Sequence, residues 1–150
     1  MADIVSKEKR SQMMSGIKSK NTKPELIIRS ALHGAGLRFR LHVKDLPGKP
    51  DLVLPKYRAA IFVNGCFWHG HSCHMFKMPR SRPEFWNSKI RRNQEVDSEA
   101  LRKLLENGWR VATIWECSLR GKGKLEVPGI IEMIQIWINS DQQVLEISGC

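Results

Sequence analysis

The 150-residue chain has 41% hydrophobic and 27% charged residues, a composition that indicates one globular domain and excludes an intrinsically disordered chain. Its 25 basic and 15 acidic side chains give a formal net charge of +10, which favours a nucleic-acid partner over a merely soluble basic protein. No run of about 18 apolar residues occurs, and the start, MADIVSKEKRSQMM, lacks the apolar core of a secretory signal. We therefore expect a soluble cytoplasmic protein with no membrane segment.

The first half of the chain predicts a helix followed by three strands. Residues 1–21 are polar and basic, and we expect them to form an N-terminal arm or a short helix. Thr22-Lys-Pro-Glu25 matches a capping box with proline in the first turn, so a helix begins here and ends near Gly34 or Gly36. The predicted strands that follow cover residues 37–43, 51–55 and 59–64. The third of them, AAIFVN, is apolar enough to be central in a sheet.

The second half predicts a long helix, a strand and a final helix. Ser81-Arg-Pro-Glu84 repeats the capping-box pattern and opens a helix that Asn107-Gly108 closes. The predicted elements are a helix over residues 82–107, a strand over 109–116 and a helix over 128–139.

This order, α-β-β-β-α-β-α, predicts an α/β fold with a mixed central sheet flanked by helices. A helical crossover joins the strands at 59–64 and 109–116, so these two strands are predicted to be parallel neighbours. The predicted domain covers residues 22–140, and residues 141–150 are predicted to form a C-terminal tail.

Cysteine and histidine side chains concentrate in one loop, NGCFWHGHSCH at residues 64–74. Neighbouring strands would bring a further cysteine, at the end of strand 109–116, to the same edge of the sheet. Three thiolates and one imidazole suit a closed tetrahedral structural zinc site. The predicted ligands are Cys66, His71, Cys73 and Cys117. His69 and His74 compete for the nitrogen position, and buried free cysteines are the alternative to a metal site.

A second group of side chains suits phosphodiester chemistry. Asp51 begins a short strand after PGKP, and Glu25 lies at the start of the first helix. Carboxylates in these places suit Mg²⁺, and His69 could relay a proton to water or to a leaving oxygen. The capping box alone explains Glu25 equally well, and a turn cap is the alternative for Asp51. His33 and His42 are expected to decorate a helix and a strand.

Large aromatic side chains lie close to basic ones. Phe67 and Trp68 are adjacent in the loop, and Trp86 lies in the first turn of the long helix among arginines and lysines. Apolar side chains beside cations are typical of proteins that wedge into a base stack. The alternative is packing around the zinc loop. Phe85 is expected to belong to the core face of that helix.

Several long motifs in this chain resemble one known family. They are RSQMMSGIKSKNTKPE, LPGKPDLVLP, AAIFVNGCFWHGHSC, FWNSKIRRN and GWRVATIWECSLR. Together they resemble the very-short-patch repair (Vsr) mismatch endonucleases from about residue 10 to residue 121.

The resemblance implies a restriction-endonuclease-like fold, with residues 22–140 as a nuclease domain that contains a structural zinc site. It implies a Mg²⁺-dependent nick 5′ to the thymine of a T:G mismatch, the lesion left when 5-methylcytosine deaminates. It implies double-stranded DNA as the partner, with mismatch-repair proteins and a companion cytosine-5 methyltransferase as further partners and a nucleoid-associated location. A mismatch is asymmetric, so we expect a monomer.

The resemblance also implies roles for individual residues. Asp51 and the main-chain carbonyl of Val63 would bind Mg²⁺, while His69 would assist proton transfer and Glu25 would support the site. The zinc ligands would be the four named above. The residues implied in DNA binding are Phe67, Trp68 and Trp86, which would intercalate, Met14 and Ile17, which would approach the minor groove, and Lys89 and Asn93, which would contact the mismatched pair.

The chain departs from the family pattern at two positions. Asn64 stands where a family member carries histidine; an amide can hydrogen-bond a phosphate or water but cannot titrate, so proton transfer would rest more on His69. Val96 replaces an arginine near Asp97. Two other functions remain open: a restriction or repair nuclease acting on matched or otherwise damaged DNA, and a non-catalytic zinc-stabilised DNA-binding module.

Overall fold

The structure, a computed structural model, describes residues 22–149 as a five-stranded mixed sheet with helices on both faces. The strands are β1 (Arg40–Leu41), β2 (Leu52–Leu54), β3 (Ala59–Asn64), β4 (Arg110–Trp115) and β5 (Val144–Ile147). The helices are α2 (Lys23–Gly34), α3 (Pro83–Glu106) and α4 (Val127–Ile138), with short 3₁₀ turns η1 (Pro55–Tyr57) and η2 (Glu116–Ser118). None of the helices in residues 22–149 has the length and apolarity to cross a membrane.

The strands lie side by side in the order β1-β2-β3-β4-β5. The pairs β1–β2 and β2–β3 are antiparallel, whereas β3–β4 and β4–β5 are parallel. The predicted neighbours at 59–64 and 109–116 are confirmed as β3 and β4, which α3 joins. Because parallel strands end at the same edge, the residues after β3, β4 and β5 meet there.

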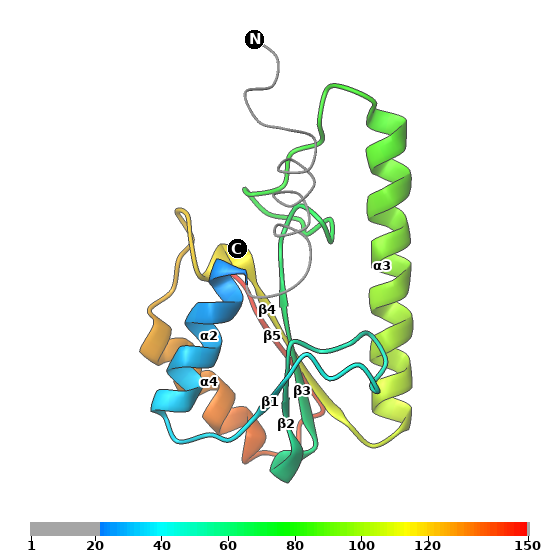
Figure 1. Ribbon diagram of the computed structural model, residues 1–150. Coiled ribbons are helices and arrows are strands. Elements are labelled where there is room, and N and C mark those ends of the chain that lie inside the picture. Colours follow the sequence, from blue (N-terminus) through cyan, green and yellow to red (C-terminus); the bar gives the residue numbers. More distant parts are fainter. Residues whose placement is uncertain (1–21, 150) are drawn as a thin grey trace, which may run out of the picture.

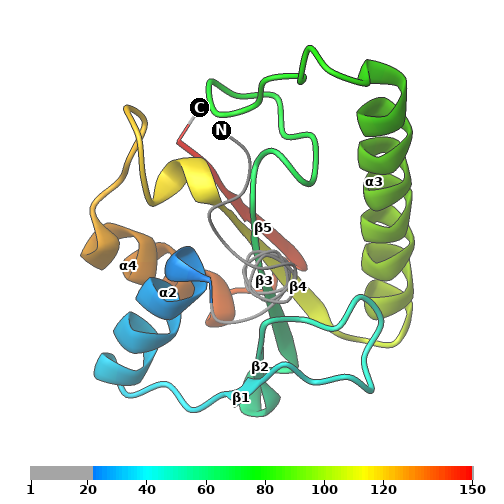
Figure 2. The ribbon, with the colours of Figure 1, turned by 45° about the horizontal axis from the view of Figure 1, so that its top comes forward.

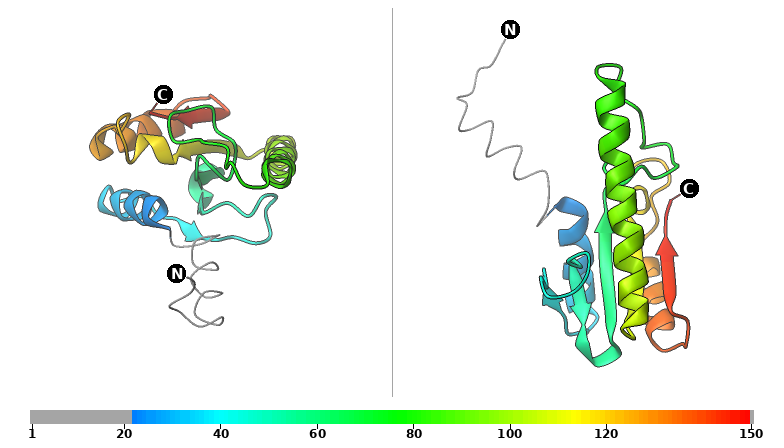
Figure 3. Two further views of the ribbon diagram at one scale, coloured as in Figure 1. Left: turned by 90° about the horizontal axis from the view of Figure 1, so that it is seen from above. Right: turned by 90° about the vertical axis from the view of Figure 1, so that its right-hand side faces the viewer.

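Two hydrophobic layers hold the helices on the sheet. Helices α2 and α4 pack together on one face, and α3 covers the other, as Figure 1 and the view from above in Figure 3 show. Side chains alternate along β3: Ile61 packs with α2 and α4, while Ala60 packs with Leu104 of α3. Strand β3 is therefore covered on both faces of the sheet, which confirms the central position predicted from its apolar sequence.

Three local predictions need correction. The strand expected over 37–43 is reduced to Arg40–Leu41, since His42 turns into the left-handed region with φ of 48°. The long helix begins after Arg82, whose φ is 53° and whose side chain makes no capping hydrogen bond, so Ser81 is not its cap. Residues 144–147, assigned to a tail, form β5 and pair with β4. By contrast, the Thr22 hydroxyl does accept the Glu25 amide, at 3.4 Å, at the start of α2.

Candidate active site and metal centre

The residues that carry chemistry gather at the edge of the sheet where β3, β4 and β5 end. The loop of residues 65–82 leaves β3 there and arches beside the upper half of α3 (Figures 1 and 2). Two α3 side chains hold this loop: Asn93 donates to the Trp68 carbonyl at 2.8 Å, and Gln94 donates to the carbonyls of His69 and Gly70. Gly70 has φ of 61°, and a Cβ there would lie 2.7 Å from the Ile90 Cγ2 on α3, so glycine lets the loop lie this close to the helix.

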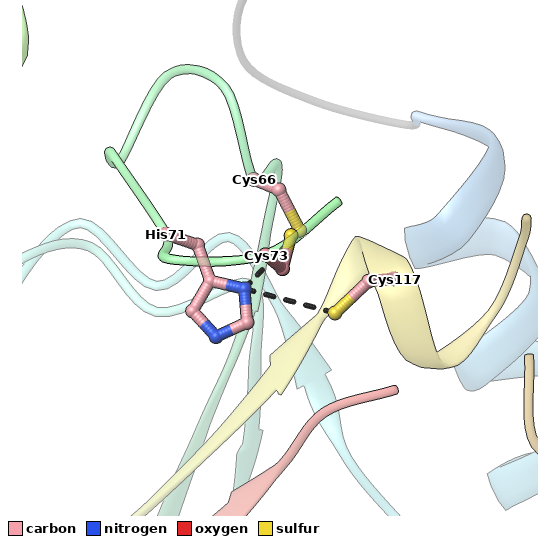
Figure 4. A group of neighbouring side chains, drawn as sticks. All are labelled: Cys66, His71, Cys73 and Cys117. Carbon is pink, nitrogen blue, oxygen red and sulfur yellow. Dashed lines mark hydrogen bonds between the residues drawn. The ribbon is translucent and has the colours of Figure 1, made fainter. Parts of the chain in front are cut away.

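One imidazole and three thiols converge at the base of this loop (Figure 4). The His71 Nδ1 lies 3.5 Å from the Cys66 Sγ and 3.6 Å from the Cys117 Sγ. With Cys73, the four ligand atoms all lie within 4.8 Å of one another, and none of the three cysteines is in a disulfide. Atoms bound to zinc at tetrahedral angles lie about 3.6 Å apart. The four residues therefore fit a tetrahedral ion, and Nδ1 is the nitrogen that would bind it.

Neighbouring groups orient these four side chains. Backbone amides donate to two sulfurs, Gly149 to Cys117 at 3.2 Å and Met75 to Cys73 at 3.4 Å. The His71 ring stacks on Trp115, with centroids 4.1 Å apart and planes 4° apart. Burial lowers the pKa of His71, which keeps its imidazole neutral, as a metal ligand must be. Burial also raises the pKa of the Cys66 thiol, so a bound cation is what would stabilise its thiolate.

His69 and His74, the alternatives for the nitrogen position, are not part of this cluster. The His69 Nδ1 instead lies 2.5 Å from the Asp97 Oδ2 on α3. A carboxylate in this place holds the proton on Nδ1, so Nε2 is left as the atom that can accept or donate a proton. Asp97 has a structural role that the sequence prediction missed. It lies one turn after Asn93 on α3, and that spacing places both residues on the face toward the loop.

A second cluster contains the two carboxylates. The Glu25 side chain is only 1% exposed, and its Oε2 lies 2.8 Å from the His42 Nε2 and 3.4 Å from the Arg29 Nη1. Ligand atoms of Glu25, His42 and Asp51 all lie within 4.8 Å of one another. The expectation that His42 merely decorates a strand is therefore wrong, because its ring reaches the buried carboxylate of α2.

Asp51 connects this cluster to the end of β3. Its Oδ2 accepts the Val63 amide at 2.7 Å, which leaves its other oxygen for a ligand. Burial is the main cause that raises the pKa of Asp51 to about 6; the nearby Glu25 charge raises it further, whereas the Val63 amide, His42 and His69 lower it. The backbone links this cluster to the His69–Asp97 pair, because Gly65, two residues after Val63, accepts the His69 amide at 3.3 Å. Asn64, the half-buried last residue of β3, follows Val63 directly.

The predicted intercalating side chains form one aromatic cluster. Phe67 contacts both Trp68 and Trp86 edge to face, with ring centroids 5.2 and 5.4 Å apart, and Trp68 lies 5.7 Å from Trp86. All three are half-buried. Phe85, expected in the core, is 46% exposed and carries the Arg82 guanidinium on its ring. A preformed cluster of exposed and half-buried rings thus lies beside the two sites.

The remaining DNA-binding candidates fall in two groups. Lys89 lies exposed on α3, with the exposed Arg91 and Arg92 nearby in the chain. Met14 and Ile17 lie outside the residues that the structure describes, as do the predicted arm at 1–21 and Cys150.

Comparison with known proteins identifies the family. Residues 2–75 match the family described as DNA mismatch endonuclease Vsr. The chain is 49% identical over 126 residues to the type II nicking enzyme V.XorIIP of Xanthomonas oryzae pv. oryzae, covering 84% of this chain and 93% of that protein. It is 46% identical over 138 residues to the DNA mismatch endonuclease Vsr of Escherichia coli K12, covering 92% and 88%. A type II nicking enzyme of Neisseria meningitidis, V.NmeAIP, is 44% identical over 122 residues, covering 81% and 87%. The chain therefore belongs to the Vsr family of DNA mismatch endonucleases.

Proposed function

We propose that this protein is a Mg²⁺-dependent endonuclease that nicks DNA 5′ to the thymine of a T:G mismatch and so begins very-short-patch repair of deaminated 5-methylcytosine. Its relatives are named as a mismatch endonuclease and as nicking enzymes. The observation that carries the proposal is the carboxylate cluster around Asp51, which the end of β3 links to the His69–Asp97 pair and to the aromatic cluster at Trp68. This arrangement favours a nuclease over a non-catalytic DNA-binding module.

The proposed chemistry divides between the carboxylate cluster around Asp51 and the His69–Asp97 pair. A Mg²⁺ ion held by Asp51 and the Val63 carbonyl would offset charge on the scissile phosphate. The Nε2 of His69, oriented by Asp97, transfers a proton to or from the reacting oxygens. Glu25 supports the site from α2, and Asn64 can hydrogen-bond a phosphate or a water but cannot carry a proton.

The tetrahedral cluster is proposed as a structural zinc site, since four protein ligands leave no open position. Zinc would fold a loop that has few core contacts of its own. Asn93 and Gln94 of α3 hold this same loop through its carbonyls at Trp68, His69 and Gly70. The loop then presents the aromatic rings to DNA and His69 to the phosphate.

The finer features of the family are also proposed for this chain. They are the restriction-endonuclease-like fold, a monomeric state, a cytoplasmic location at the nucleoid, and partnership with mismatch-repair proteins and a cytosine-5 methyltransferase. Intercalation by Phe67, Trp68 and Trp86 agrees with their partial exposure and with the exposed basic residues of α3. Met14, Ile17, Lys89 and Asn93 are proposed to contact the DNA around the mismatch.

Trp68→Ala is expected to reduce binding to a T:G duplex by about 10-fold to 100-fold, since stacking of an aromatic ring on a base contributes about 1–3 kcal/mol. Binding to the matched duplex should fall much less, because phosphate contacts dominate it. Titrations of both duplexes at one salt concentration measure the difference. Phe85→Ala is the control, an exposed ring that contacts Trp86. An equal loss on matched and mismatched DNA would contradict a wedge.

Asp97→Asn is expected to slow nicking by about 100-fold, within the range that general acid–base catalysis contributes. The amide cannot fix the Nδ1 proton of His69 as the carboxylate does. Single-turnover nicking on the T:G duplex, measured across pH, checks this, because the pH profile should change along with the rate. Glu95→Gln, an exposed position on the same helix, is the control. Wild-type rates for Asp97→Asn would mean that His69 needs no orienting partner.

One nicking experiment tests the proposed function. A labelled duplex is made as T:G, C:G and T:A versions, each within a panel of methyltransferase target sequences. Zinc-loaded protein is added with Mg²⁺ or in Mg²⁺-free buffer. A Mg²⁺-dependent nick confined to the thymine strand of the mismatch is the expected result. Cleavage of matched duplexes would identify a restriction-like nuclease instead, and binding without any cleavage across the panel would identify a DNA-binding module.

A further inference from the structure

A histidine side chain joins the two carboxylates of the candidate active site in one cluster. The His42 Nε2 is 2.8 Å from the Glu25 Oε2, and one ligand atom each of Glu25, His42 and Asp51 lie within 4.8 Å of one another. The Glu25 carboxylate is almost fully buried, whereas the His42 side chain is 21% exposed. The three residues come from different segments of the chain: α2, the end of β1, and the start of β2.

The contact of His42 with Glu25 depends on an unusual backbone conformation at His42. Strand β1 pairs with β2 up to Leu41, and the His42 amide then donates to the Asp51 carbonyl at 3.0 Å. At His42 the chain enters the left-handed region, with φ of 48°, which is uncommon for residues other than glycine, although asparagine, aspartate and histidine adopt it more often than most. The turn sends the imidazole toward Glu25 instead of along the strand. Strained backbone of this kind concentrates at functional sites.

The distances suit a shared ion. Two ligand atoms bound to the same divalent ion at a right angle lie about 3 Å apart. The separation of 2.8 Å between His42 and Glu25 agrees with that value as well as with a direct hydrogen bond. The donor set separates the candidate ions. Mg²⁺ prefers oxygen ligands and keeps most of its waters, whereas an imidazole nitrogen favours first-row transition ions.

We propose that Glu25, His42 and Asp51 form a three-ligand site for a divalent transition ion, and that His42 makes this site bind Mn²⁺ more tightly than Mg²⁺. The inference rests on the proposed function, since it gives the catalytic ion at Asp51 two further protein ligands. The competing role for His42 is a hydrogen-bond donor that only positions Glu25.

The test measures Mn²⁺ binding to zinc-loaded, DNA-free protein from the EPR signal of free Mn²⁺, with Mg²⁺ affinity obtained by competition. The variants are His42→Gln and His42→Asn. Both side chains keep an N–H donor for Glu25 but lack the imidazole, and asparagine also tolerates the left-handed backbone. His33→Gln, an exposed histidine on α2, is the matched control. Thermal unfolding confirms that each variant is folded.

Both His42 variants are expected to bind Mn²⁺ at least about 10-fold more weakly, the scale of losses seen around metal sites. Their Mg²⁺ affinity should change by less than about threefold. Pulsed EPR of Mn²⁺ on the unaltered protein should show coupling to a bound histidine nitrogen. Unchanged Mn²⁺ binding, an equal loss for both ions, or no nitrogen coupling would each overturn the proposal.

Parallel nicking assays on the T:G duplex with each ion separate this inference from the proposed function. If the unaltered protein nicks the mismatch with neither ion, the proposed function fails, while the Mn²⁺ binding data still decide the role of His42. If the protein nicks but the His42 variants bind Mn²⁺ normally, only the inference about His42 fails.

Discussion

Asp51→Asn is expected to slow nicking by at least about 1,000-fold and to raise the free energy of unfolding of the protein. The rate falls because the amide is a poor ligand for the ion that offsets charge on the phosphate, a contribution of several kcal/mol. Asparagine keeps an oxygen that can accept the Val63 amide, so the end of β3 stays in place. Alanine at this position would also stop nicking, but it would leave that buried amide without its acceptor.

The gain in stability follows from the pKa of Asp51, which burial raises from 3.8 to about 6. A raised carboxyl pKa means that the folded protein holds the proton more tightly than the unfolded chain does. The penalty is therefore absent below about pH 4, grows between about pH 4 and pH 6, and is complete above that. Asparagine carries no such penalty, so we expect its variant to gain about 1–3 kcal/mol at pH 8.

Thermal unfolding in Mg²⁺-free buffer at pH 8 and near pH 4, with zinc retained, checks this prediction. The difference in melting temperature between Asp51→Asn and the unaltered protein should be positive at pH 8 and should vanish near pH 4. Single-turnover nicking on the T:G duplex measures the rate. Nicking by Asp51→Asn at the unaltered rate would remove Asp51 from the mechanism, and an equal or lower melting temperature at pH 8 would show that its burial carries no cost.

Cys117→Ser is expected to lose the bound zinc and, with it, both stability and nicking. Cys117 is the proposed ligand that would tie the loop to the end of β4, and the Gly149 amide after β5 donates to its sulfur. Since metal binding at such a site is part of the folding free energy, we expect a loss of about 3 kcal/mol or more. In a domain of this size that lowers the melting temperature by about 6–12 °C.

Nicking should fall by at least about 100-fold in the same variant, because the loop carries His69, Phe67 and Trp68. Zinc per chain, melting temperature and nicking rate are measured together, and tryptophan fluorescence should change because Trp115 stacks on His71. Cys150→Ser is the matched control, a cysteine outside the predicted ligand set. A Cys117→Ser protein that keeps one zinc per chain and the original melting temperature would exclude Cys117 as a ligand.

Sequence alone predicted the features that arise from short-range signals. The Thr22 cap needs only residues of one turn, and the apolar run at 59–64 is visible within six positions. A helix between that run and the next apolar strand required a parallel crossover, which the structure confirms for β3 and β4. The parallel pair in turn explains why Cys117 meets Cys66 and His71 although it lies 46 residues beyond that histidine.

Tertiary structure decided the features that depend on contacts between distant residues. Asp97 pairs with His69 over 28 positions, and His42 reaches Glu25 over 17, so no local period shows either pair. The Ser81 cap was wrong because a capping pattern states only a local preference, and here Arg82 adopts a left-handed conformation instead. Strand β5 was missed because its four residues gain stability from pairing with β4 at the sheet edge. Residue types and spacing thus indicated the chemistry, whereas the partners that orient it were set by packing.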